Sequence, residues 1–197
     1  PLNSHYTMPV AETASNLCET IVKRAAYREA ESRAEKINIL ETDLQDSTQV
    51  IVDIYSRYLF ETAAFEARKT SLPSAKDFNR MMIEAQKESY GDGLDPEFLN
   101  PGMWICKSHY YSGGLSFYNF PYAFGLLFAK GIYAKYLEEG STFVPKLDAL
   151  LRATGKMKVE DVASVVGIDL TDPSFWRKGL EKIGEDIEEF IRLTTEK

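Results

Sequence analysis

Hydrophobic residues recur every three or four positions along most of the chain, which is the spacing of amphipathic helices. An alanine-rich segment near the start carries Leu17, Ile21 and Val22 at this spacing, and alanine favours helix formation. Residues 31–68 repeat the pattern over a greater length, with a break expected near Asp46. The sequence contains no alternation of apolar and polar residues long enough for a strand. The pattern therefore predicts an all-α protein.

Proline, glycine and small polar residues mark where further helices are expected to begin and end. Ser71 or Ser74 is expected to cap a helix that follows a proline-containing turn. A long helix is expected from Ser116 to Glu139, because Pro121 lies close enough to its start to be tolerated. The last part of the chain is expected to form three helices: residues 143–153, residues 159–166, and a final helix opened by Asp172 and Pro173.

The composition is that of a globular domain, with 197 residues of which 44% are hydrophobic and 27% are charged. We expect residues 1–197 to form a single all-α unit without an internal repeat or a clear linker. A formal net charge of −7 argues against nucleic acid or an anionic membrane surface as a partner, because both attract basic proteins. The sequence contains no apolar run that approaches the roughly 20 residues of a membrane-spanning helix.

The two cysteines, Cys18 and Cys106, lie outside any C-x-x-C arrangement. We expect both to be small buried hydrophobic residues in a reducing compartment, because free cysteine is commonly buried. No signal-peptide pattern is present at the start of the sequence. These features predict a cytoplasmic protein.

The densest aromatic cluster of the sequence lies between Trp104 and Glu139 and includes His109, one of only two histidines. Four tyrosines follow the histidine closely: Tyr110, Tyr111, Tyr118 and Tyr122. Each buried phenol must find a hydrogen-bond partner, so a segment built only for packing would use fewer of them. Hydroxyl donors beside an imidazole can stabilise negative charge on oxygen during acyl transfer, where each donor contributes about 2.7–4 kcal/mol. Packing in a helical core is the competing interpretation.

Two glutamates in the first helical segment, Glu12 and Glu19, are seven positions apart, so their carboxylates face the same side of a helix. Ser15 and Asn16 lie between them on that side. Two carboxylates with two small polar side chains form a candidate polar site on a helix flanked by apolar residues. A solvent-exposed face is the competing interpretation, because glutamates are ordinary on such a face.

Several other kinds of site lack their motifs. The pairs Gly91-Asp-Gly and Gly113-Gly are too short for a phosphate-binding loop and lack its lysine. Neither His5 nor His109 follows a glutamate by three positions, as a di-iron helix bundle would require. No strand–turn–helix context supports a nucleophile triad. Two histidines are also few for a catalytic zinc, which usually takes three protein ligands.

Four short motifs stand out: M-P-V-A-E-T-A-S-N-L-C-E from Met8, H-Y-Y-S-G-G-L-S-F-Y-N-F-P-Y-A-F-G from His109, L-L-R-A-T-G from Leu150 and D-P-S-F-W from Asp172. Together they resemble the oligoendopeptidase F family of thimet-type zinc metallopeptidases. The resemblance extends from the first residues to the C-terminal helix. It implies the all-α, multi-helix C-terminal portion of a zincin-type oligopeptidase with a deep substrate cleft.

The resemblance implies roles for the two glutamates. The glutamate of A-E-T-A-S is the third zinc ligand of the family and falls on Glu12, while a later glutamate that supports the zinc site falls on Glu19. The motif H-E-x-x-H, which carries the other two ligands and the general base, is absent from these 197 residues. His5 has no histidine four positions away. The chain, which begins without methionine, is therefore expected to be the C-terminal half of the catalytic region of a larger peptidase.

The resemblance also implies roles in the tyrosine-rich segment. The family's histidine on the tyrosine-rich loop falls on His109, and the tyrosines that stabilise the tetrahedral intermediate fall on Tyr118 and Tyr122. Gly125 stands where the thimet-like branch has a further tyrosine. The choice among these tyrosines and the two that directly follow the histidine stays open.

The function implied by the resemblance is zinc-assisted hydrolysis of short peptides by the intact enzyme, with His109 and Tyr118 or Tyr122 stabilising the oxyanion. The present chain is expected to bind zinc weakly or not at all, to be inactive alone, and to self-associate through an exposed interior face. A non-catalytic helical peptide-binding or interaction module is the alternative. A self-sufficient metallohydrolase using His5, Glu12 and His109 is disfavoured by the usual ligand count.

Overall fold

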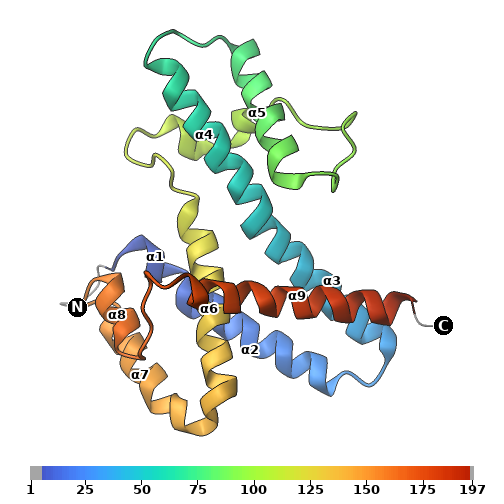
Figure 1. The fold of residues 1–197 in the computed structure, drawn as a ribbon, viewed down its shortest axis with the longest axis vertical. Coiled ribbons are helices and arrows are strands. Elements are labelled where there is room, and N and C mark those ends of the chain that lie inside the picture. The colour runs from blue at the N-terminus through green and yellow to red at the C-terminus, as the bar shows by residue number, and fades with distance from the viewer. Residues whose placement is uncertain (1–5, 196–197) are drawn as a thin grey trace. The chain divides into compact units, whose positions relative to one another are not determined.

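The computed structural model describes residues 6–195, and these residues form helices and connecting turns with no strand among them. The prediction of an all-α protein is therefore confirmed. The chain divides into two compact units (Figure 1). The terminal unit consists of the described residues up to Ser47 and from Pro121, and the central unit consists of residues 48–120. That residues 1–197 form one domain stays a prediction.

The terminal unit is built from short and long helices around a core to which α6 and other helices of the unit contribute. Its fully buried side chains include Phe128, Ile132, Phe143, Leu150 and Val162. The helices are α1 (Met8–Ala11), α2 (Thr13–Glu29), α3 (Arg33–Thr48), α6 (Phe120–Glu139), α7 (Val144–Ala153), α8 (Val159–Ser164) and α9 (Pro173–Thr195). The last three confirm the helices expected in this part of the sequence to within a few residues.

Small residues allow α6 and α9 to approach closely in the terminal unit. A Cβ atom added to Gly131 of α6 would lie 2.5 Å from the ring of Phe175 in α9. A Cβ atom added to Gly179 of α9 would lie 3.0 Å from the carbonyl oxygen of Leu127. Because cores are closely packed, a larger residue at the first position would force the ring to move.

Charged side chains connect four helices of the terminal unit. Lys130 of α6 is 1% exposed, and its Nζ lies 2.9 Å from the carboxylate of Asp43 in α3. The Nζ of Lys23 in α2 lies 3.2 Å from the same carboxylate. Burial alone would raise the pKa of Asp43, but the two lysine charges hold it below its usual value. Arg24 of α2 forms a second such pair with Asp186 of α9.

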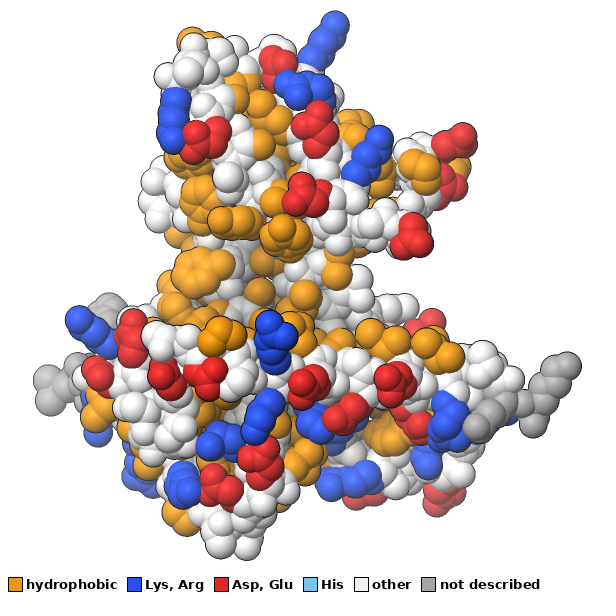
Figure 2. Space-filling model, in the orientation of Figure 1, with side chains coloured by type: hydrophobic (Ala, Val, Ile, Leu, Met, Phe, Trp, Pro, Cys, Tyr) orange, Lys and Arg blue, Asp and Glu red, His pale blue; other side chains and the backbone are white. Residues whose placement is uncertain are grey.

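Acidic and basic side chains are intermixed over the face of the terminal unit shown in Figure 2, with hydrophobic side chains exposed between them. The exposed apolar residues of α9 are Leu180, Ile187 and Ile191. Among the described helices, none combines the length and the hydropathy that a membrane-spanning segment requires.

The central unit is organised by the helix pair α4 (Ile54–Arg68) and α5 (Ala75–Tyr90). A π-helical turn at Gln49–Asp53 separates α3 from α4, close to the break expected near Asp46. Ser74, one of the two serines expected to cap this helix, caps α5 and forms a capping box with Asp77. The buried core of this unit consists of Phe60, Met81, Met82 and Ala85. Two 3-10 turns, Met103–Cys106 and Ser108–Tyr111, follow α5 in the sequence.

Two expectations from the sequence are wrong in detail. Cys18 and Cys106 are both exposed rather than buried. Cys18 follows the buried Leu17 by one helical position and so faces away from the core. The long helix begins at Phe120 and not at Ser116, because the preceding residues remain in turns.

Candidate functional site

Glu12 lies at the junction between α1 and α2 in the terminal unit. Its backbone carbonyl accepts hydrogen bonds from the side chains of Ser15, at 2.9 Å, and Asn16, at 2.7 Å. Its carboxylate accepts a further hydrogen bond from the Ser15 hydroxyl at 3.2 Å. A Cβ atom added to Gly125 of α6 would lie 2.8 Å from the Cβ of Glu12, so this glycine allows the close approach of α6. The position of Glu12 is thus fixed by contacts on two sides.

Glu19 follows on α2 but has a different environment. Its carboxylate lies 2.6 Å from the Nζ of Lys23, and half of its side chain is exposed. Such an exposed pair within one helix contributes little to stability. The role predicted for Glu19 in supporting a zinc site therefore stays a prediction.

Metal ligands do not gather in the described part of the chain. Among residues 6–195, no group of three or more His, Cys, Asp or Glu side chains is arranged to hold a metal ion. His5, one of the histidines considered above, lies outside the described residues. A catalytic zinc usually takes three protein ligands, so Glu12 and its described neighbours do not by themselves fit this metal.

His109 and Tyr118 are brought together in the central unit. Their ring centroids are 4.8 Å apart, with an angle of 33° between the ring planes. His109 belongs to the second 3-10 turn, and its Nδ1 is buried without a hydrogen-bond partner among the described residues. Because buried polar groups are usually paired, the unpaired imidazole nitrogen marks His109 as a candidate functional residue.

The other three candidate tyrosines have different environments. Tyr110 packs against Phe60 with ring centroids 5.2 Å apart, and burial raises the pKa of its phenol. Tyr111 is 62% exposed. Tyr122 belongs to α6 in the terminal unit. The ring of Tyr118 contacts that of His109 within the central unit.

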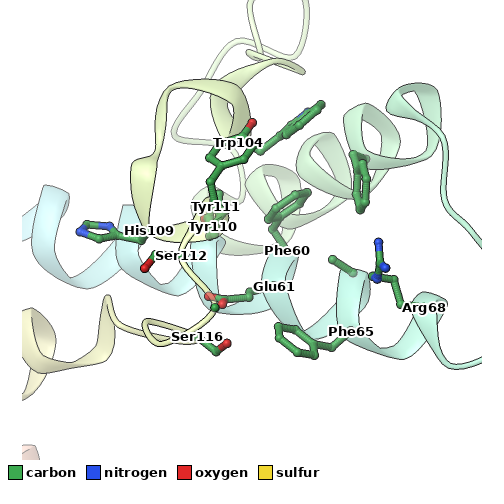
Figure 3. Close-up of a pocket in the computed structure, with 13 residues that line it drawn as sticks. Phe60, Glu61, Phe65, Arg68, Trp104, His109, Tyr110, Tyr111, Ser112 and Ser116 are labelled. Atoms are coloured by element: carbon green, nitrogen blue, oxygen red, sulfur yellow. The ribbon is translucent and has the colours of Figure 1, made fainter.

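A cavity of about 430 Å³ lies in the central unit, and His109 is one of the residues that line it (Figure 3). Its volume falls within the range of small-molecule and peptide side-chain sites, about 300–1,000 Å³. Six of its lining side chains are Phe, Tyr or Trp: Phe60, Phe65, Phe78, Trp104, Tyr110 and Tyr111. Polar groups are fewer: Glu61, Arg68, His109, Ser112 and Ser116. This lining suits a large apolar group with a small number of polar contacts.

One wall of the cavity is held in place by a hydrogen bond. The indole N–H of Trp104 donates to the Oδ1 of Asn79 at 2.9 Å, and its ring lies 5.3 Å from that of Phe78. Buried indoles usually find such a partner. The wall is therefore formed before any ligand binds.

Glu61 of α4 was not singled out by the sequence analysis, which treated residues 31–68 as a plain amphipathic wall. Its side chain is buried, and its Oε1 accepts a hydrogen bond from the backbone N–H of Phe117 at 2.7 Å. Burial raises the pKa of this carboxyl, opposed by the Phe117 hydrogen bond and by His109. One signal was present in the sequence: Arg57 and Glu61 are in helical phase with the apolar Ile54.

Neither a protein-family model nor a curated protein sequence matches the chain. Its structure is similar to the crystal structure of oligoendopeptidase-F from Enterococcus faecium, with a TM-score of 0.82 and 19% sequence identity. The similarity covers 98% of this chain and 37% of the oligoendopeptidase chain, so this chain spans little more than a third of that protein. At this identity the comparison establishes a shared fold. The chain has the helical fold of part of an oligoendopeptidase.

Proposed function

We propose that the chain is part of a zinc metalloendopeptidase that hydrolyses short peptides. The observation that carries this proposal is the fold shared with oligoendopeptidase-F over 98% of the chain. The A-E-T-A-S and F-Y-N-F-P-Y motifs resemble the same family independently of the fold. Fold alone does not define a function, so the proposal depends on the residues that would carry the chemistry.

In this proposal Glu12 is one of the zinc ligands. Its fixed position between α1 and α2, against Gly125, supports the role because metal ligands require preorganised geometry. The remaining ligands would come from residues outside this chain, since the described residues offer no three-ligand group. When bound in the intact enzyme, zinc would supply Lewis-acid activation of a water molecule.

His109 and Tyr118 are proposed to stabilise the oxyanion. The phenol of Tyr118 can donate a hydrogen bond, and the imidazole of His109 can donate one from a ring nitrogen. Their ring separation of 4.8 Å supports a joint role. Tyr122 remains a further candidate by family resemblance, whereas the ring of Tyr110 packs in the core of the central unit.

The aromatic cavity is proposed to accept an apolar side chain of the peptide. Six aromatic side chains line it, and aromatic contacts contribute beyond simple burial, by about 0.5–1.5 kcal/mol for each pair. Serines at its edge, Ser112 and Ser116, can bond to a peptide backbone.

The alternative function, a non-catalytic peptide-binding module, is favoured by one observation. The whole cavity is lined by residues of the central unit and does not require Glu12. Peptide binding without hydrolysis would need nothing beyond this unit.

A comparison of the chain with the product of its whole gene tests the proposal. We expect the gene to encode an H-E-x-x-H helix upstream of Glu12, and its product to cleave an internally quenched peptide while the 197-residue chain does not. His109→Gln should lower kcat of the whole product by about 100-fold or more, the effect of losing one oxyanion donor. A gene without H-E-x-x-H, whose product binds peptides without cleaving them, would favour the alternative.

Self-association of the isolated chain also remains a proposal. It is supported by exposed apolar side chains on α9. Light scattering coupled to size exclusion would show a mass that rises with concentration, whereas a constant monomer mass would reject it.

A further inference from the structure

The segment that carries Tyr118 is tied to α4 at two points within the central unit. The backbone N–H of Phe117 donates to the Oε1 of Glu61 at 2.7 Å. The Nη1 of Arg57 donates to the Oδ1 of Asn119 at 3.0 Å. Tyr118 is therefore the residue between two anchored neighbours.

The first anchor holds an unfavourable backbone conformation. Phe117 has a φ of +56°, and among residues 6–195 it is the one non-glycine residue with positive φ. This left-handed region is sterically disfavoured for residues with a Cβ atom. The Phe117 ring also packs on α4, with centroids 5.4 Å from Phe65 and 5.8 Å from Tyr58. Such conformations persist where surrounding contacts enforce them.

The second anchor is itself held by an ion pair. Arg57 pairs with Asp53 one helical turn earlier, and both side chains are buried. Asp53, at the end of the π-helical turn, is followed at intervals of four residues by Arg57 and Glu61 of α4. The three side chains therefore lie along one side of the helix and form what we call the α4 clamp.

Stabilising a core does not require buried charged residues such as those of the α4 clamp. Buried charges are expensive to desolvate, and apolar residues of similar size are often as stabilising. The clamp and its partner Asn119 also leave polar atoms without hydrogen-bond partners among the described residues, namely Asp53 Oδ1, Arg57 Nε and Asn119 Nδ2. Its two bonds hold both neighbours of Tyr118, Phe117 by its backbone N–H and Asn119 by its side-chain amide. The Tyr118 ring between them contacts that of His109.

We propose that Glu61 and Arg57 are positioning residues that hold the Phe117–Asn119 segment so that Tyr118 stays against His109. A catalytic effect of this positioning rests on the proposed function. The position of Tyr118 against His109 does not depend on that function. Donors that stabilise an oxyanion must be held close to their productive geometry by the residues around them. Figure 3 shows Glu61 directed toward the segment that carries Ser112 and Ser116.

NMR of the 197-residue chain with labelled histidines tests the proposal. The chain has two histidines, so His109→Gln assigns the signals and His5 serves as an internal reference. Tyr118→Leu gives the position of the His109 ring signal without the neighbouring tyrosine ring. Spectra of all variants are compared at one fixed pH.

The matched pair Glu61→Ala and Glu61→Gln separates positioning from general stability. Alanine cannot accept the Phe117 N–H, so the His109 signal should move most of the way to its position in Tyr118→Leu. The glutamine carbonyl can accept it, so the signal should stay at its original position. Asn119→Ala, which removes only the Arg57 contact, gives the same readout if Glu61→Ala does not fold.

The proposal would be overturned if Glu61→Ala and Asn119→Ala fold and leave the His109 signal unmoved, or if Glu61→Gln moves it as far as alanine does. Neither outcome depends on catalysis, so it is distinguishable from a failure of the peptidase proposal. In an active whole-gene product, Glu61→Ala should lower kcat with little change in KM, and Glu61→Gln should restore it.

Discussion

The two units differ in how completely their buried polar groups are paired. In the terminal unit, Lys130 and Asp186 are buried and each has a partner of opposite charge on another helix. In the central unit lie all the buried side-chain atoms without a hydrogen-bond partner among the described residues: Asp53 Oδ1, Arg57 Nε, His109 Nδ1, Tyr110 Oη and Asn119 Nδ2. Native cores seldom leave such groups unpaired. The difference indicates that the central unit keeps buried polar groups that packing alone does not require.

The largest effect is expected where a paired charge of the terminal unit is broken. Lys130→Met should lower the free energy of unfolding by about 3–5 kcal/mol, because it breaks the ion pair of a buried lysine and leaves the partly buried Asp43 with one lysine instead of two. Urea unfolding followed by circular dichroism measures the loss. The control Lys135→Met, on the same helix with its Nζ 3.9 Å from a partly exposed Glu139, should change stability by less than about 1 kcal/mol. Equal losses in both variants would remove the contrast between the units.

A smaller loss is expected from overpacking the contact between α6 and α9. Gly131→Ala places a Cβ atom 2.5 Å from the Phe175 ring and should destabilise the chain by about 1–3 kcal/mol. Gly184→Ala on α9 meets no atom within 4 Å and should stabilise it by about 0.5–1 kcal/mol through helix propensity. Thermal unfolding of the pair measures both signs. A stabilising Gly131→Ala would show that this contact is looser than the structure indicates.

Peptide binding should be confined to the central unit. In a Trp176→Phe chain the remaining tryptophan is Trp104, which lines the cavity, so its fluorescence reports occupancy. A short peptide with a central phenylalanine should change this emission, and Phe65→Ala should weaken binding by about 0.5–1.5 kcal/mol. The same peptide with serine in place of phenylalanine is the control. Identical responses to both peptides would mean that the cavity does not bind the side chain.

The smallest effect is a pH dependence of stability that originates from Glu61. Burial raises the pKa of this carboxyl above its ordinary 4.5 in the folded chain. The wild-type chain therefore loses stability, relative to Glu61→Gln, as pH rises from about 4.5 through the raised pKa. Unfolding free energies of the two proteins across this range test the sign. A wild-type chain that gains stability over the same range relative to the variant would show that the hydrogen bond from Phe117 outweighs burial.

The helices were largely predictable because their signals are local. Each signal acts on residues only a few positions away in the sequence. Ser74 marks the start of α5 and Pro173 marks the start of α9, as the apolar periodicity around them also indicates. The prediction that Pro121 would be tolerated near the start of this helix is confirmed, because Pro121 lies in the first turn of α6. The start of α6 was misplaced because Phe117 is held in a turn by Glu61, which is 56 residues away in sequence.

The candidate site was only partly predictable for the same reason. Composition drew attention to His109 and its tyrosines, but their spacing could not rank Tyr118 above Tyr110, since only the fold shows which ring reaches the imidazole. Glu61 was missed because its importance comes from a contact with a distant backbone group. The burial expected for Cys18 was wrong because a general preference of cysteine was applied to a residue on the exposed side of α2.

The central claim, that Glu12 belongs to a zinc site completed by residues outside this chain, is tested most directly by calorimetric zinc titration. The product of the whole gene and the 197-residue chain are titrated in parallel, each with Glu12→Gln and with Glu41→Gln, an exposed glutamate of α3, as the matched control. We predict about one tight zinc per whole-gene product. We also predict that Glu12→Gln lowers the zinc affinity of the whole-gene product by more than the 10–100-fold typical of residues that only hydrogen-bond to a metal ligand. The 197-residue chain should have no tight zinc site. Full affinity in Glu12→Gln, or a tight zinc in the short chain that Glu12→Gln removes, would contradict the account.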